Sequence, residues 1–285
     1  MGRRLGFVLV FVGLFLLFFG LFERVYAYPR LKKAPLDQYS EPVATGTGTY
    51  FNLGRLAEVD GAQLKNLRVV RGDVRAGTEE VAVWDSFNST VDTADQGVIT
   101  ATQERIALDR VTGQSVQCCG ENPRHQGLTL KFPFDTRKTT YQFWDGPAQR
   151  ALPATFTREE RINGVRVYRF EQRIDRLDVG DRDLPGSLAG DPEAATVPTD
   201  VIYSNVKTLW VEPATGIIVK AQQDVTQVLE TPAGGPVLTL LGTVLPVAAL
   251  LLALVCLAAG LVLLRSPEGR RVARPEGESR PAGAV

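Results

Sequence analysis

The sequence predicts a mainly β extracytoplasmic domain, an antiparallel curled sheet or half-barrel, flanked by two transmembrane α-helices. A long uncharged run lies near each end of the chain, and between them apolar and polar residues alternate with period two. Such alternation is typical of strands that bury one face. We therefore divide the chain into an N-terminal anchor (1–28), a β-rich domain (29–236), a second span (237–264) and a tail (265–285).

The first apolar run covers residues 5–22, which are 18 positions without a charge or an amide. As a helix it would measure about 27 Å, close to the roughly 30 Å core of a bilayer. A cleaved signal peptide is the alternative, because Val25-Tyr26-Ala27 resembles a cleavage site. The run is longer than the apolar part of ordinary signal peptides, and Glu23 and Arg24 follow it. We expect a retained anchor.

The second apolar run covers residues 237–264, which are 28 uncharged positions, and its span is expected to begin near Gly242 or Pro246. It is followed by Arg265, Arg270, Arg271 and Arg274. The positive-inside rule then places the C-terminus in the cytoplasm. With two spans, both termini are cytoplasmic and the large domain lies outside the plasma membrane. The tail lacks apolar periodicity and is expected to be disordered.

The middle region reads as consecutive hairpins. Asn163-Gly164 separates the alternating runs 154–162 and 165–174, and this dipeptide favours a tight hairpin turn. Further hairpins are predicted between 206–212 and 217–225, and around Thr112-Gly113 between 99–111 and 114–118. The remaining predicted strands are 43–51, 67–74, 81–87, 128–132 and 139–144. Residues 55–67 are expected to hold a short helical turn, and 178–199 a surface loop or lid.

Composition excludes several functions. Lys+Arg and Asp+Glu balance at 32 each, which argues against a nucleic-acid binder. The chain has one histidine, His125, and three cysteines, which excludes a multi-histidine or four-cysteine metal site. His125 lies in a turn-rich segment and is expected to be an exposed loop residue. No Gly-x-Ser-x-Gly motif is present. We expect no enzyme activity, no metal and no cofactor.

Cys118 and Cys119 are adjacent, and three states are open to them: a vicinal disulfide, an intermolecular bridge or two free thiols. Neighbouring residues on a flat strand point to opposite faces, which opposes a vicinal bridge. A turn at Cys119-Gly120 would remove that obstacle. Because the domain is expected outside the cytoplasm, we predict that both cysteines are oxidised.

Several short motifs occur together along the chain. They are the sequences at 36–40, 45–51, 117–120, 127–134, 141–145 and 208–216. With the first apolar run, this combination resembles the actinobacterial DUF3068 family, also labelled the porin PorA family, over nearly the whole length. The resemblance implies an actinobacterial envelope protein with two terminal transmembrane helices and a porin role. The hairpin 209–220 is also similar to a strand pair in bacterial lipoprotein-carrier and mycobacterial lipid-binding lipoprotein folds, which enclose an acyl-chain cavity.

The residue pattern leads to a first hypothesis of a membrane-anchored, non-enzymatic envelope domain that binds a lipid or glycolipid or serves as a scaffold. The apolar face expected for this role includes Phe156, Val165, Val167, Leu209, Val211, Ile217 and Val219. The residues predicted to line an apolar groove are Trp84, Trp144, Phe156, Val167, Trp210 and Ile217, with ordinary core packing as the alternative for the tryptophans. The other function hypothesis is the porin or channel that the family label implies. An apolar groove would favour lipid binding and a polar lumen transport.

Overall fold

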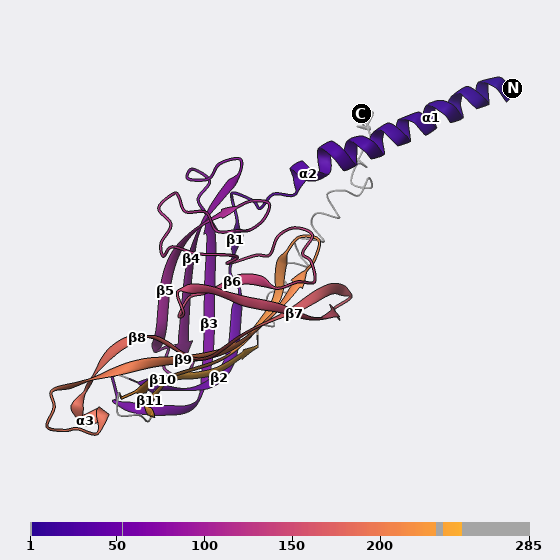
Figure 1. Cartoon of the computed structure of the whole chain (residues 1–285). Helices are drawn as coiled ribbons and strands as arrows, with labels where there is room; N and C mark the ends of the chain where they lie inside the picture. Colours follow the sequence, from indigo (N-terminus) through magenta and orange to yellow (C-terminus); the bar gives the residue numbers. More distant parts are fainter. Residues whose placement is uncertain (1, 53, 232–235, 247–285) are drawn as a thin grey trace, which may run out of the picture. The chain divides into compact units, whose positions relative to one another are not determined.

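The computed structural model describes residues 2–52, 54–231 and 236–246, and antiparallel strands make up most of them (Figure 1). The helical elements are α1 (Gly2–Phe22), the π-helical η1 (Glu23–Ala27), α2 (Tyr28–Leu31) and α3 (Gly186–Ala189). The strands are β1 (Tyr39–Ser40), β2 (Val43–Asn52), β3 (Ala57–Gly72), β4 (Val81–Asp92), β5 (Val98–Asp109), β6 (Tyr141–Asp145), β7 (Arg150–Ile162), β8 (Val165–Pro185), β9 (Thr196–Glu212), β10 (Ile217–Glu230) and β11 (Pro236–Pro246).

The first apolar run forms a helix, as predicted. The segment Gly6–Tyr26 has 21 residues and a mean hydropathy of 2.4, and it is the one helix in the described residues long and apolar enough to cross a membrane. Leu, Phe and Val side chains along it are exposed. An uncovered apolar helix of this length suits a bilayer.

A second transmembrane helix is not part of the described structure, and its expected beginning is a strand. Pro236–Pro246 forms β11, which pairs with β10 over its whole length, from Glu230–Pro236 to Gln222–Pro246. Pairing with an existing strand satisfies the backbone groups of this segment, which explains why it is extended here. Residues 247–264 and the tail 265–285 lie outside the described residues.

All named strand pairs are antiparallel and belong to one sheet. Its strand order is β5-β4-β3-β2-β11-β10-β9-β8-β7-β6, and β1 pairs with β3. The edge strands β5 and β6 do not pair with each other among the described strands, so the sheet is not a closed barrel. Residues 110–140, which we call the seam segment, connect the two edges. Isolated β-bridges pair Leu108 with Ser115, Gln114 with Leu128, and Leu128 with Phe143.

Two predicted hairpins are present in the structure. Asn163 and Gly164 join β7 to β8 with φ angles of 49° and 83°, the left-handed conformation that an Asn-Gly turn supplies. Residues 213–216 join β9 to β10, where Gly216 has a φ of 75°. The register of these hairpins fixes which side chains share a face.

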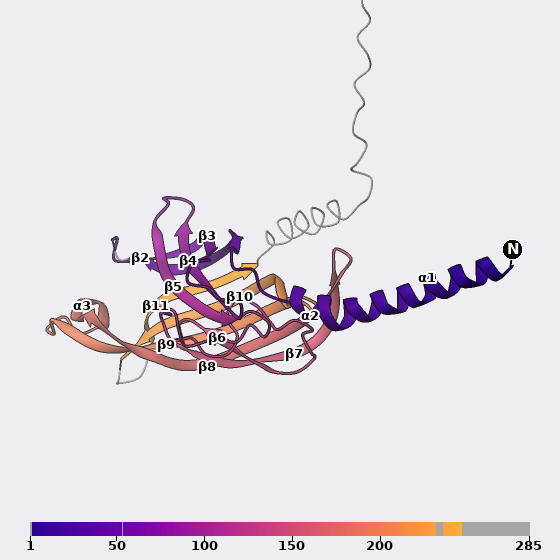
Figure 2. The same cartoon turned by 90° about the horizontal axis from the view of Figure 1, so that it is seen from above.

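Three local predictions were wrong. Residues 55–67 hold a turn followed by β3, because Ala57–Gly72 pairs with β2 and β4. Residues 178–199 are mostly strand, because β8 and β9 stay paired as far as Pro185–Thr196 and α3 closes the ribbon (Figures 1 and 2). The register shift between Asp178 and Asp181 accommodates Gly180, which in the sequence favours a loop. Residues 128–132 make only isolated bridges within the seam segment.

The seam segment packs on one face of the sheet, which we call the inward face. Leu128 and Phe132 contact one apolar cluster, whose other members are Phe143, Ala154, Tyr168, Phe170, Leu209 and Val211. Leu130 packs against a second cluster, made of Ala34, Val70, Ala82, Trp84, Ile106 and Leu108. The two halves of the sheet are therefore joined through the side chains of the segment that follows β5.

Candidate functional site

The seam segment carries the predicted cysteine pair in a tight turn. The structure joins Cys118 and Cys119 by a disulfide. Cys119 and Gly120 have φ angles of 62° and 75°, so a turn lies where the vicinal bridge requires one. The Glu121 amide donates to the Cys118 carbonyl at 3.0 Å and completes the turn. The intermolecular bridge and the free thiols are the alternatives not seen here.

Arg105 of β5 fixes this disulfide turn against the sheet. Its Nε donates to the Cys119 carbonyl at 3.0 Å, and its Nη1 donates to both carboxylate oxygens of Asp85 at 2.9 and 3.0 Å. Its Nη2 contacts Asp73 at 2.5 Å. The Arg105 and Asn122 backbones also exchange hydrogen bonds at 2.8 and 3.0 Å. Nε thus holds the turn, and the other two guanidinium nitrogens hold Arg105 to Asp85 and Asp73.

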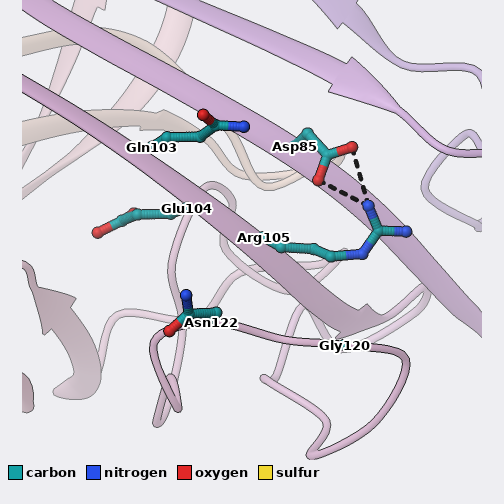
Figure 3. Close-up of a pocket in the computed structure, with 6 residues that line it drawn as sticks. All are labelled: Asp85, Gln103, Glu104, Arg105, Gly120 and Asn122. Atoms are coloured by element: carbon teal, nitrogen blue, oxygen red, sulfur yellow. Dashed lines mark hydrogen bonds and ion pairs between the residues drawn. The ribbon is translucent and has the colours of Figure 1, made fainter.

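A polar pocket of about 470 Å³ lies between β5 and the disulfide turn. The lining residues are Asp85, Gln103, Glu104, Arg105, Gly120 and Asn122. Figure 3 shows Arg105 turned toward Asp85 and Glu104 pointing to the other side of β5. Carboxylate, amide and guanidinium groups line the pocket, so a solute bound there would meet hydrogen-bonding side chains.

His125 lies behind this pocket and is buried, which corrects the expectation of an exposed loop residue. It is 1% exposed, and its ring centroid is 5.0 Å from that of Trp144. Its amide donates to Glu121 Oε1 at 2.8 Å, and its Nδ1 is 3.2 Å from the same oxygen. Its Nε2 is 3.6 Å from Glu104 Oε2. The loop folds back onto β5 and β6, because the ring finds both an aromatic surface and carboxylates there.

Glu104 connects the pocket to the inward face. Burial alone would raise the pKa of its carboxyl, but the His125 ring, Arg68 and Lys207 lower that pKa below its ordinary value. Burial likewise lowers the pKa of the Arg68 guanidinium, against the attraction of Glu104. The carboxylate therefore stays ionised and belongs to a set of charges on the inward face.

A second inward-facing charge cluster lies on β6 and β9. Lys207 Nζ donates to Asp145 Oδ2 at 2.8 Å, and the two side chains are 10% and 1% exposed. The Tyr203 hydroxyl donates to the same oxygen at 3.2 Å, and Asn205 Nδ2 donates to that hydroxyl at 2.8 Å. Burial, and then the charge of Asp145, raise the pKa of Tyr203. Buried charges of this kind need a partner to remain ionised.

The inward face is polar between its apolar clusters. Strand register places Arg68, Ser86, Asn88, Thr90, Thr102 and Glu104 on this face of β3–β5. On β8–β10 the same face carries Gln172, Asn205, Lys207 and Gln223. The sequence predicts an apolar concave face, and this face differs from that prediction. Phe156 and Leu209 point inward. Val165 and Val167 fall on the other face because they alternate along β8 with the inward Tyr168 and Phe170, and Ile217 falls there because it pairs with Glu212.

The residues predicted to line a groove do not share one surface. Trp84 lies in the apolar cluster of β3–β5, and its Nε1 donates to the Pro35 carbonyl at 3.1 Å. Trp144 lies beside His125. Phe156 packs at the edge of the other apolar cluster, opposite Phe170. On the outward face, Val167 is fully buried, Trp210 donates to Glu160 at 3.1 Å, and Ile217 is half-buried.

Sequence reasoning missed the charged residues of the inward face. A usable signal was present in the alternation itself. Lys207 occupies the same parity as Leu209 and Val211, and Glu104 the same parity as Ile106 and Leu108. A charge at a position where the pattern demands a buried side chain indicates a polar interior.

The chain combines an apolar helix long enough to cross a membrane with an antiparallel, β-rich domain whose inward face is polar between its apolar clusters. The family model described as Porin PorA matches residues 5–240, so the chain belongs to that family. This confirms the resemblance seen in the sequence.

Two curated relatives, both named Porin PorA, are similar to the chain. The protein of Corynebacterium resistens is 23% identical over an alignment 317 positions long, which covers 77% of this chain and 76% of the relative. The protein of Corynebacterium amycolatum is 22% identical over an alignment 301 positions long, which covers 79% of this chain and 77% of the relative. Both alignments extend over most of each chain.

Proposed function

We propose that the chain is a non-enzymatic, channel-type protein of the cell envelope, in which α1 attaches the protein to the membrane and the sheet forms a polar vestibule. The names of its relatives support a channel role. The observation that carries the proposal is the position of Glu104, which lines the polar pocket and also faces Arg68 and Lys207. An ionised carboxylate at a pore entrance attracts cations and repels anions.

We propose that the sheet lies in water, outside the bilayer. Its outward face carries Lys65, Arg71, Gln103, Arg173 and Asp224, all exposed. A lipid-facing strand needs an unbroken apolar set on its outward side, because each charge at the bilayer centre costs about 2–4 kcal/mol. The bilayer is therefore crossed by helices, and the sheet lies outside it.

The helix α1 supports an assembly across the bilayer. Gly6, Gly13 and Gly20 recur every seven residues and fall on one side of the helix, and no atom lies within 4 Å of where their Cβ atoms would be. Small residues on one side let transmembrane helices approach closely. We propose that copies of α1 pack through these glycines and that the polar vestibules of their sheets admit ions.

Reconstitution of the full chain in a planar lipid bilayer tests this function. We expect discrete conductance steps. Replacing Gly13 by isoleucine should abolish them by separating the helices, whereas Phe15→Ile, on the opposite side of α1, should leave them. A folded chain that gives no conductance above that of the empty bilayer and carries co-purified lipid would refute the channel and favour the lipid-binding alternative.

A further inference from the structure

We infer that the tip of the β7–β8 hairpin is a docking surface for anionic lipid headgroups of the same bilayer that α1 enters. The surface consists of Arg137, Lys138, Arg158, Arg161, Val165 and Arg166. This inference rests on the attachment of α1 to a membrane, which is part of the proposed function. It does not depend on ion conduction. Three features indicate a phospholipid surface as the partner: the position of the tip, its positive charge and one exposed apolar side chain.

The sheet is tied to the membrane helix by a short connection. The candidate span ends at Tyr26, and six residues later Lys32 forms an ion pair with Asp135. Lys33 Nζ contacts Glu79 Oε1 at 3.0 Å, and the Ala34 amide donates to the Arg110 carbonyl at 2.7 Å. Six residues reach about 9 Å as a helix and about 20 Å when extended. This end of the sheet therefore stays close to the headgroups.

The β7–β8 tip lies at the same end of the sheet. Asp135, which holds Lys32, donates its amide to the Ala214 carbonyl of the β9–β10 turn at 3.2 Å. In the adjoining strand pair, Tyr168 of β8 lies opposite Val211 of β9, next to that turn. The hairpin then continues for three more residues to Val165, which is about 10 Å further out at the rise of a strand. The tip therefore projects past the turn that holds the membrane-proximal segment.

The tip carries an excess of positive charge. Five basic residues stand against Glu159 and Glu160, a net charge of 5 − 2 = +3. Both carboxylates already have partners, since Lys138 lies 2.9 Å from Glu159 and Arg158 lies 2.6 Å from Glu160. Within the described residues, Arg161 and Arg166 form no ion pair, and both are exposed. Their charges are therefore available to an external anion.

An exposed apolar side chain lies next to these two arginines at the end of the hairpin, on the opposite face of the strand pair. Val165 is 40% exposed and directly follows the Asn163-Gly164 turn, at the most distant point of the hairpin. Basic side chains together with an exposed apolar residue are typical of elements that bind lipid surfaces. Each arginine near an anionic membrane strengthens association by about fivefold. Because α1 already holds the domain at the surface, even this modest gain keeps the tip engaged.

Depth measurements in nanodiscs test the docking surface. A fluorophore is attached at Val165→Cys in the full chain carrying Cys256→Ser, and a matched probe at Ser187→Cys in α3. Quenching by a headgroup-labelled lipid is compared in phosphatidylcholine discs with and without phosphatidylglycerol. We expect strong quenching at position 165 that depends on phosphatidylglycerol and falls with added salt, and little quenching at position 187.

A charge-matched pair of variants completes the test. Arg161→Gln with Arg166→Gln should lower the association of the tip with the bilayer by about twenty-five-fold, that is, about fivefold for each arginine. Arg71→Gln with Arg173→Gln removes the same charge from the outward face of the sheet and should leave the quenching unchanged. Equal quenching at positions 165 and 187, or quenching that persists in pure phosphatidylcholine or in the tip variant, would overturn the inference.

Discussion

Replacing Asp145 by alanine lowers the free energy of unfolding by about 3–5 kcal/mol, because it leaves the Lys207 ammonium buried without a counter-ion. The same carboxylate accepts from Tyr203 at 3.2 Å and from the Ala148 amide at 3.2 Å, and both donors lose their acceptor. The measurement is chemical unfolding of the detergent-solubilised chain, followed by near-ultraviolet circular dichroism.

Two further variants separate the charge from the packing. Adding Lys207→Met to Asp145→Ala should restore most of the lost stability, since a buried pair can be replaced by apolar groups at little cost. Glu159→Gln breaks the Lys138–Glu159 pair, whose side chains are 50% and 39% exposed, and should cost less than about 1 kcal/mol. An Asp145→Ala protein as stable as the parent would mean that Lys207 reaches water.

Replacing Gly216 by alanine has an effect of similar size for a different reason. Gly216 has a φ of 75°, and a Cβ there would lie 2.0 Å from the Phe132 carbonyl oxygen. That carbonyl belongs to the seam segment, and the Phe132 amide donates to the Gly216 carbonyl at 2.8 Å. The turn and the seam segment must separate, which exposes Phe132 and the apolar cluster around it. We expect a loss of about 3 kcal/mol or more, the range of severe core disruptions.

Gly164 provides a matched control for this substitution. It also has a positive φ, 83°, in the turn of a neighbouring hairpin, but nothing lies within 4 Å of the position of a Cβ. Gly164→Ala should therefore cost only the conformational strain, about 1–2 kcal/mol. Thermal unfolding of the two variants compares them directly, and equal losses would contradict the tight contact between the β9–β10 turn and the seam segment.

The fold class could be predicted because its determinants are local. Strict alternation predicts strands, and Asn163-Gly164 sets a turn type through the conformations that these two residues adopt. The segment 178–199 is predicted as a loop from the sequence, because Gly and Pro residues usually interrupt a strand. In the structure it is mostly paired, since a bulge accommodates such residues. Residues 237–246 belong to the run predicted as a second span, with the helix expected to begin near Gly242 or Pro246. They form a strand instead, because an apolar run does not show whether the segment has a strand to pair with.

The candidate site depended on long-range pairing. Glu104 meets His125 only because the seam segment folds back onto β5, and Asp145 meets Lys207 only through the order β9-β8-β7-β6. No spacing in the sequence encodes these contacts. Bulges decide which residues share a face, since one extra residue moves every later side chain to the other side. The predicted groove set is divided between two faces because Val167 and Trp210 alternate with the inward Phe170 and Leu209, and because the register shift after Ile218 turns Ile217 outward.

The charge selectivity of single channels formed by the Glu104→Gln chain tests whether ions pass the polar inward face. The parent channel should favour cations over anions, and the variant should lose a substantial part of that preference while its conductance steps remain. Glu193→Gln removes an equal charge from an exposed position beyond α3 and should leave the permeability ratio unchanged. A Glu104→Gln channel with the selectivity of the parent would show that ions do not pass this face.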